Sequence, residues 1–173
     1  MNTRMIEVEN LSFNYGRRKS KVLENFSMKL DKGSVYGLLG KNGTGKSTLL
    51  YLMAGLLRPQ TGNVLYKGVD VKKRYPDTLQ DMFLVPEEFA LPNVSLKQYV
   101  KLNAPFYPNF SDELLNACLR DFDMNVDIHL GELSMGQKKK AFMCFALATN
   151  TSLLMMDEPT NGLDIPSKSQ FRK

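Results

Sequence analysis

The stretch Gly40-Lys41-Asn42-Gly43-Thr44-Gly45-Lys46-Ser47 decides the fold of this 173-residue chain. It matches the pattern G-x-x-x-x-G-K-[ST], whose glycines let successive backbone N–H groups converge on phosphate oxygens at the start of a helix. Residues 35–39 form an apolar run before it, which predicts a central strand buried on both faces, and residues 46–57 have helical composition. This order predicts a P-loop that binds ATP and Mg2+, in which Lys46 reaches the β- and γ-phosphates and Ser47 ligates the metal.

A second apolar segment, residues 152–156, reads as a buried strand that ends in Asp157 and Glu158. Such a strand delivers carboxylates to the phosphate end of the sheet, so we expect Asp157 to hold magnesium, directly or through water. Glu158, one residue further on, is positioned to polarise the attacking water. A strand that ends in Asp-Glu is by itself a common turn, and the P-loop upstream is what gives these carboxylates a catalytic interpretation.

The rest of the chain alternates between strand and helix patterns. Four further segments read as strands: residues 5–13, 22–30, 64–71 and 82–85. Between residues 92 and 130 apolar side chains recur at helical spacing, with Ser111 as an expected N-cap, and another helix is expected from about residue 135 to Ala148. These patterns predict an α/β fold: a P-loop NTPase core with a mostly parallel central sheet, an N-terminal antiparallel β portion and an inserted helical subdomain.

The composition is that of a globular protein. Hydrophobic residues make up 43% and charged residues 24% of the chain, which argues against disordered and fibrous classes. The net charge of +5 is modest, and the short basic runs at residues 17–21 and 138–140 read as surface charge. Cys118 and Cys144 have no partner at metal-ligand spacing and read as buried, reduced thiols of a cytosolic protein.

No targeting or membrane-spanning segment is predicted. The N-terminus alternates polar and apolar residues and lacks the apolar centre of a signal peptide. The longest apolar stretch, residues 48–57, is far shorter than the roughly 20 residues that span a bilayer. We therefore expect a soluble protein, which can still dock on a membrane partner.

Between the P-loop and the carboxylates lies Leu133-Ser134-Met135-Gly136-Gln137. A hydroxyl, a glycine N–H and a helix N-terminus form an anion-binding turn, although alone this segment is indistinguishable from a serine-capped helix. In order with the other two motifs it resembles the LSGGQ signature of ATP-binding cassette (ABC) ATPases. The resemblance runs from Ile6 to Asp164, and Met135 replaces the first glycine of the signature while Ser134 and Gly136 remain.

The resemblance implies an ATPase site shared by two cassettes. Tyr15 stands where the family carries an aromatic residue that stacks on adenine, and Phe13, two residues earlier, reads as the core residue. Asp164 stands in a D-loop that connects the two sites. The nucleotide-binding residues implied are Tyr15, Gly40, Asn42, Gly43, Gly45, Lys46, Ser47, Thr48, Ser134, Gly136 and Asp164.

Besides Met135, two further features depart from the family pattern. Glu87 occupies the place of a glutamine that approaches magnesium and the attacking water, so we assign it a role in catalysis and in metal binding beside Ser47 and Asp157. The family continues past the D-loop to a switch-region histidine, whereas the single histidine here, His129, precedes the signature and reads as an exposed or capping residue. We expect this chain to be the N-terminal part of a longer protein, and to bind ATP but hydrolyse it poorly on its own.

The resemblance implies one incomplete cassette over residues 1–173: a core with the antiparallel β portion (1–87), a helical subdomain (88–150) and a return to the core (151–173). Its implied function is the ATP-hydrolysing subunit of an ABC transporter, peripheral on the inner face of the cell membrane. The partners are a transmembrane permease and a second cassette in a head-to-tail dimer, with no nucleic acid. Two alternatives stay open: a non-transport ABC ATPase that acts on nucleic acid or the ribosome, and a module that senses ATP.

Overall fold

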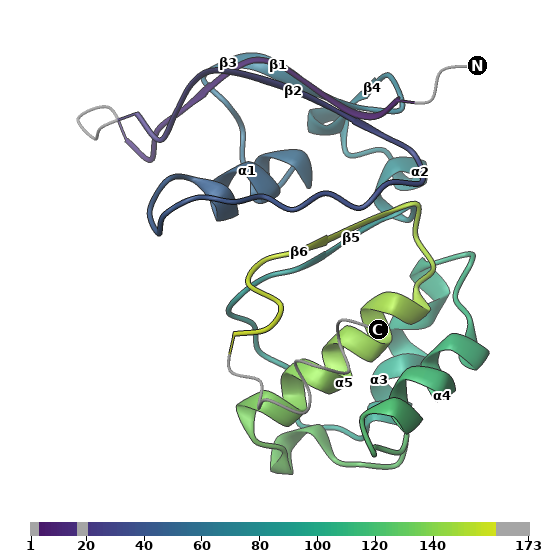
Figure 1. Ribbon diagram of the computed structural model, residues 1–173. Coiled ribbons are helices and arrows are strands. Elements are labelled where there is room, and N and C mark those ends of the chain that lie inside the picture. Colours follow the sequence, from purple (N-terminus) through teal and green to yellow (C-terminus); the bar gives the residue numbers. More distant parts are fainter. Residues whose placement is uncertain (1–3, 17–20, 162–173) are drawn as a thin grey trace. The chain divides into compact units, whose positions relative to one another are not determined.

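The computed structural model describes residues 4–16 and 21–161 (Figure 1). The chain divides into two compact units, the first up to Met82 and the second from Phe83 onward. Among the described residues, no helix is long and apolar enough to cross a membrane.

An antiparallel sheet forms the largest part of the first unit, with strand order β2-β1-β3-β4. Its strands are β1 (Arg4–Phe13), β2 (Leu23–Asp31), β3 (Thr61–Tyr66) and β4 (Val69–Asp70). Val8 in β1 is paired with Met28 of β2 on one side and Val64 of β3 on the other. Because side chains alternate across a strand, Ile6 and Val8 of β1 are buried together. The register shifts between Val8 and Leu11, and Leu11 beyond that shift is buried as well. The predicted antiparallel β portion is confirmed.

The prediction of one strand over residues 64–71 is wrong, because a hairpin turn interrupts it. Lys67 and Gly68, between β3 and β4, have φ values of +47° and +81°. A two-residue turn with both central residues at positive φ matches the right-handed twist of the flanking strands. The two residues Lys67 and Gly68 therefore end the strand at Tyr66, and a second short strand begins at Val69.

Residues 35–39, which the sequence predicts to be a central strand, do not form one. They belong to neither of the two sheets in the described part of the chain, and the side chains of Val35 and Leu39 are exposed. An apolar run has the composition of a buried strand, but it becomes one only when neighbouring strands supply hydrogen-bond partners on both sides. The prediction of a central strand over residues 35–39 is wrong in this structure.

The remaining elements of the first unit are helical. They are α1 (Lys46–Met53), the 3-10 turn η1 (Val71–Lys73) and α2 (Pro76–Leu79). Helix α1 ends before the predicted residue 57, because Gly55 follows the C-cap in the left-handed conformation at φ +67°. Glycine is required there, since a Cβ would lie 2.8 Å from the carbonyl oxygen of Val71. Its buried face, which includes Leu49 and Leu52, contributes to the core of this unit.

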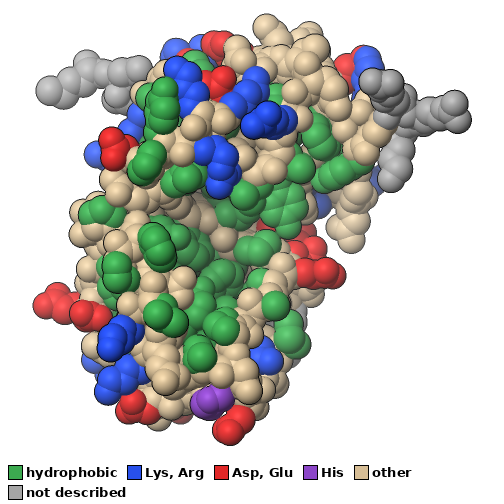
Figure 2. Space-filling view, turned by 180° about the vertical axis from the view of Figure 1, so that it is seen from behind, with side chains coloured by type: hydrophobic (Ala, Val, Ile, Leu, Met, Phe, Trp, Pro, Cys, Tyr) green, Lys and Arg blue, Asp and Glu red, His purple; other side chains and the backbone are tan. Residues whose placement is uncertain are grey.

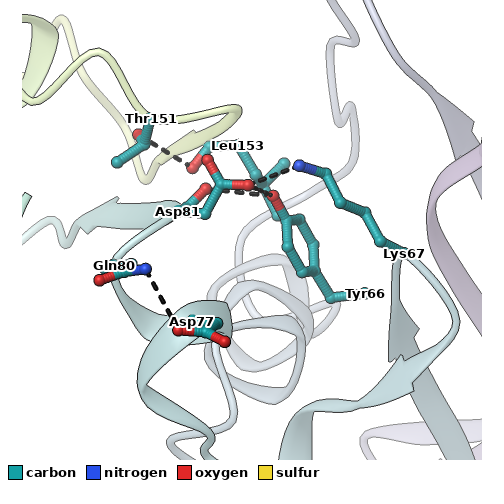
Figure 3. Close-up of polar contacts among 7 residues, drawn as sticks. All are labelled: Tyr66, Lys67, Asp77, Gln80, Asp81, Thr151 and Leu153. Carbon is teal, nitrogen blue, oxygen red and sulfur yellow. Dashed lines mark hydrogen bonds and ion pairs between the residues drawn. The ribbon is translucent and has the colours of Figure 1, made fainter. Parts of the chain in front are cut away.

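A cluster of polar side chains lies at the end of strand β3 in the first unit. The hydroxyl of Tyr66 donates to the carboxylate of Asp81 at 2.7 Å, and the ammonium of Lys67 forms an ion pair with the same carboxylate (Figure 3). Burial, followed by the hydrogen bond with Asp81, raises the pKa of Tyr66 to about 12. The phenol therefore stays protonated and acts as a donor.

The second unit combines a two-stranded sheet with a group of helices (Figure 1). Strands β5 (Met82–Val85) and β6 (Leu153–Met156) agree with the predicted segments and are joined by a long helical crossover, the connection that parallel strands require. The helices are α3 (Leu96–Asn103), η2 (Ala104–Phe106), α4 (Asp112–Asp121), η3 (Leu130–Glu132) and α5 (Met135–Ala148).

Serine caps begin three of these helices. Ser95, Ser111 and Ser134 each accept a hydrogen bond from the backbone N–H three residues later, as the sequence predicted for Ser111. The core is built around Phe145 of α5, whose ring lies 5.0 Å from that of Tyr99 and 5.5 Å from that of Phe110. Helix α5, which carries the signature segment at its start, is thus anchored in the core of the second unit.

Both cysteines are free, as predicted. Cys144 is fully buried in α5, whereas Cys118 in α4 is only partly buried. Among the described residues, no cluster of three or more His, Cys, Asp or Glu that could hold a metal ion is found.

Candidate functional site

The P-loop in the first unit begins helix α1 with glycine backbone geometry. Gly43 has φ +81° and Gly45, the N-cap of α1, has φ +93°, conformations that L side chains rarely adopt. Within the part of the chain that the structure describes, no side chain caps this helix. The first N–H groups of α1 therefore present donors and the positive end of the helix dipole to an anion.

Two glycines of the loop leave no room for a side chain. A Cβ at Gly40 would lie 2.9 Å from Oγ1 of Thr44, and one at Gly45 would lie 2.8 Å from Cγ1 of Val22. Thr44 closes the loop, because its hydroxyl and its N–H both donate to the carbonyl of Lys41. The loop is thus a compact turn whose shape depends on glycine at both ends.

Lys46 lies over this loop. Its Nζ donates to the carbonyl oxygens of Gly40 at 2.9 Å and Lys41 at 3.3 Å. The ammonium is therefore held beside the turn that the glycines shape. This is where a lysine must be to neutralise a phosphate bound in the loop.

Tyr15 lies next to the start of α1. Its hydroxyl oxygen is 2.9 Å from Oγ1 of Thr48, which is buried, while the tyrosine side chain is 54% exposed. Phe13 is buried and meets the Tyr15 ring edge to face, with 4.9 Å between ring centroids. The expectation that Phe13 is the core residue and that Tyr15 lies outside the core is confirmed, and strand β1 ends at Phe13, so Tyr15 lies beyond the strand.

The predicted carboxylates lie in the second unit, after strand β6. Asp157 is 4% exposed, and its N–H donates to the carbonyl oxygen of Val85 in β5 at 2.9 Å. Glu158 is exposed and adopts φ +43°. Left-handed backbone at a residue with a Cβ is unusual and is found at turns and functional sites, so the chain turns sharply at this carboxylate.

Glu87 follows strand β5 and is tied to the same turn. Its Oε1 accepts a hydrogen bond of 2.8 Å from Nδ2 of Asn161. The N–H of Asn161 donates in turn to the carbonyl oxygen of Glu158 at 3.0 Å. The segments after β5 and β6 are thereby joined within the second unit.

Lys139 is a site residue that the sequence analysis missed. The prediction that residues 138–140 are all surface charge is wrong for Lys139, which is only 5% exposed and donates to the carbonyl oxygens of Glu158 and Asn161. Burial lowers the pKa of Lys139, and the nearby carboxylates of Glu87, Asp157 and Glu158 oppose that shift. The only signal in the sequence is helical spacing, since Lys139 precedes the buried Met143 and Ala146 by four and seven positions.

The signature segment opens helix α5 with a capping box. Oγ of Ser134 accepts from the N–H of Gln137 at 3.3 Å, and Oε1 of Gln137 accepts from the N–H of Ser134 at 3.0 Å. A cavity of about 250 Å3 lies beside this helix start. Its walls are formed by Glu87, Glu88, Phe89, Met135, Gly136, Lys139 and Asn161.

The predicted site residues therefore fall into two groups. Those of the P-loop and Tyr15 belong to the first unit, and Glu87, Ser134, Gly136, Asp157 and Glu158 belong to the second. Asp164 lies outside the described residues. His129 caps η3, and Figure 2 shows the single histidine at the surface of the second unit, although its Nδ1 is buried and has no hydrogen-bond partner among the described residues.

Comparisons with known proteins agree with this set of motifs. The family model described as ABC transporter matches residues 23–161. The chain is 32% identical to the ABC transporter ATP-binding protein YtrB of Bacillus subtilis, over 84% of this chain and 50% of that protein. It is 33% identical to the zinc uptake system ATP-binding protein ZurA of Listeria innocua, over 97% of this chain and 69% of that protein.

Among solved structures, one described as the ATP binding subunit of an ABC transporter matches with a TM-score of 0.85 at 27% identity, covering 96% of this chain and 71% of that one. The chain thus spans about half of the first of these relatives and about seven tenths of the other two.

Proposed function

This chain belongs to the ABC transporter family, and on that basis we propose that it binds and hydrolyses ATP to drive a transmembrane permease. The observation that carries the proposal is the P-loop of the first unit. A cradle for a triphosphate is formed by three features: a glycine turn without room for a side chain, a lysine held over that turn, and a helix whose N-cap is a glycine. The names of the relatives support the transport role.

ATP and Mg2+ fit the side chains that are present. The loop has no room for a Cβ at Gly40 or Gly45, and its backbone N–H groups would bind phosphate oxygens. Hydroxyl and carboxylate oxygens are the hard ligands that magnesium prefers. Ser47, Asp157 and Glu87 would hold the metal, which neutralises charge on the β- and γ-phosphates when bound. Tyr15 would support the adenine ring beside the start of α1.

Catalysis would rest on two groups of this chain. Lys46 would stabilise the negative charge that develops on the γ-phosphate, because its ammonium already lies over the loop. Glu158 would orient and polarise the attacking water, because its carboxylate is exposed at a sharp turn directly after the buried Asp157. Asn42, Gly43 and Thr48 would complete the phosphate contacts within the first unit.

A second cassette and a permease complete the proposed assembly. Ser134 and Gly136 of one chain would close over the ATP held by the P-loop of the other, and Asp164 would connect the two sites. The permease would contact Glu87 and the helical part of the second unit, where large hydrophobic side chains are exposed, among them Leu102 and Phe106. The cassette would then lie peripherally on the inner face of the membrane.

One observation favours a second candidate, a module that senses ATP with little turnover. Glu87 brings a carboxylate to a position that the family fills with a neutral glutamine, and Asn161 holds that carboxylate in place. A fixed negative charge near the γ-phosphate would slow attack by water without preventing nucleotide binding.

The two candidates are separated by measurements on the full-length protein. We expect ATP binding that requires Mg2+ and Lys46, and turnover that Glu158→Gln lowers by about a hundredfold while ATP affinity is kept. A Lys46→Met variant with unchanged ATP affinity would remove the P-loop from the proposal. Turnover that is already minimal, and that Glu158→Gln does not change, would favour the sensor. Stimulation of turnover by co-purified permease in lipid vesicles tests the transport role.

A further inference from the structure

Lys139 has an environment that surface lysines do not have. It lies in the second turn of α5, is 5% exposed, and its Nζ donates to the carbonyl oxygens of Glu158 at 2.7 Å and Asn161 at 3.0 Å. Lysine is almost never this buried unless polar partners compensate the lost hydration. Both partners of Lys139 belong to one turn, the turn that carries Glu158.

This turn has a conformation that needs support. Glu158 adopts φ +43°, which is disfavoured for a residue with a Cβ. The N–H of Asn161 donates to the carbonyl oxygen of Glu158, and Lys139 donates to the same oxygen and to that of Asn161. The ammonium thus fixes both ends of the turn, and through its first end it holds the backbone from which the Glu158 side chain projects.

The same turn reaches the segment after β5. Nδ2 of Asn161 donates to the carboxylate of Glu87, so Glu87, Asn161, Lys139 and Glu158 form one continuous chain of polar contacts. All four belong to the second unit, and Lys139 comes from the helix that starts with Ser134. A displacement of either Glu87 or the start of α5 would therefore be transmitted to Glu158 through contacts that already exist.

We propose that Lys139 is a positioning residue for hydrolysis: it fixes the turn after β6 so that the Glu158 carboxylate is aimed at the attacking water, and it links that carboxylate to Glu87. The proposal rests on the ATPase function proposed above. Small errors in the placement of a catalytic group cost large factors in rate, so loss of the ammonium lowers kcat without a matching loss of ATP affinity.

The test uses Lys139→Met in the full-length protein, with Lys138→Met as the matched control. Methionine keeps much of the length and apolar bulk of lysine but has no donor, and Lys138 lies on the same helix outside the chain of contacts. We expect Lys139→Met to lower kcat at least about tenfold, with ATP affinity and KM changed less than about threefold, and Lys138→Met to change neither. Lys139→Arg, which keeps charge and donors, recovers part of the lost rate.

A double variant separates positioning from a merely structural role. If Lys139 acts through Glu158, the combination Lys139→Met with Glu158→Gln is no slower than Glu158→Gln alone. Independent, additive losses overturn the proposal, as does a folded Lys139→Met with wild-type kcat. If Lys139→Met does not fold, Lys139→Gln replaces it under the same criteria. Should Glu158→Gln itself leave turnover unchanged, the proposed catalytic role of Glu158 fails, whereas failure of the Lys139 proposal leaves the effect of Glu158→Gln intact.

Discussion

The hydroxyl oxygen of Tyr15 lies 2.9 Å from that of Thr48, so a residue two positions beyond the end of strand β1 touches helix α1. Thr48 is buried and Tyr15 is half exposed, so the contact holds the tyrosine ring at the surface beside the start of helix α1. A ring fixed in this way offers a flat apolar surface next to the phosphate cradle, as an adenine base requires.

Tyr15→Ala should weaken ATP binding about five- to tenfold, because one aromatic contact contributes about 1 kcal/mol. Tyr15→Phe keeps the ring and loses only the contact with Thr48, so its ATP affinity should stay within about threefold of the wild type. Titration with a fluorescent ATP analogue measures both. Inorganic triphosphate, which has no base, should compete equally well in all three proteins. Weaker competition by triphosphate in Tyr15→Ala would mean that Tyr15 shapes the loop and does not hold the base.

Gly45→Ala should abolish most of the ATP affinity. Gly45 has φ +93°, and a Cβ there would lie 2.8 Å from Val22, so the alanine must distort the loop. Gly33 is a matched control, because it has φ +75° but a Cβ there would meet no described atom within 4 Å. Both variants should lose about 1 kcal/mol of stability from left-handed backbone strain, and only Gly45→Ala should lose more than about tenfold in ATP affinity. Equal affinities in the two variants would contradict the cradle.

Glu87→Gln should leave ATP affinity within a few fold and alter turnover: turnover falls if the carboxylate serves as a metal ligand, and it rises if the negative charge slows attack by water. Glutamine keeps an oxygen that accepts from Asn161 and removes one negative charge from the site. Glu88→Gln is the control, since it makes the same change one residue further along the same cavity wall. Steady-state phosphate release measures the effect. Turnover identical to the wild type would take Glu87 out of the mechanism.

The P-loop, the Asp157-Glu158 strand end and the serine-capped helix α5 could be predicted from the sequence, because each is a local pattern with a local cause. Strand β5 and the N-cap Ser111 were found for the same reason. Residues 35–39 could not be assigned correctly from their own composition. A strand is defined by its neighbours as well as by its side chains, and an apolar run contains no information about whether partners are present.

Lys139 shows a second limit of local patterns. In the sequence it stands between two other lysines, and a charged run reads as a solvated face. Its burial is decided by where helix α5 places its inner face against the turn after β6, which is a tertiary relationship. The polar contacts among Glu87, Asn161 and Glu158 likewise join residues up to 74 positions apart, beyond the reach of spacing arguments.

Tyr66→Phe should lower the free energy of unfolding by about 2 kcal/mol, because a buried hydroxyl loses its hydrogen bond to a charged acceptor. The Asp81 carboxylate then keeps its ion pair with Lys67 but loses the phenol donor seen in Figure 3, so part of its desolvation is no longer compensated. Thermal unfolding should shift by roughly 4 to 8 °C. Tyr75→Phe, at an exposed tyrosine of the same unit, is the matched control and should not shift.

The pH dependence of the same variant gives an independent check. The pKa of Tyr66 is raised from its usual value of 10.0 to about 12, so the folded protein holds a proton that the unfolded chain releases. Stability from this group is therefore complete below pH 10.0 and is lost as the pH rises toward about 12. Phenylalanine has no proton to hold, so the difference in stability between wild type and Tyr66→Phe should shrink across this interval. A difference that stays constant from about pH 9 to about pH 11.5 would mean that the hydroxyl of Tyr66 is not the group that Asp81 stabilises.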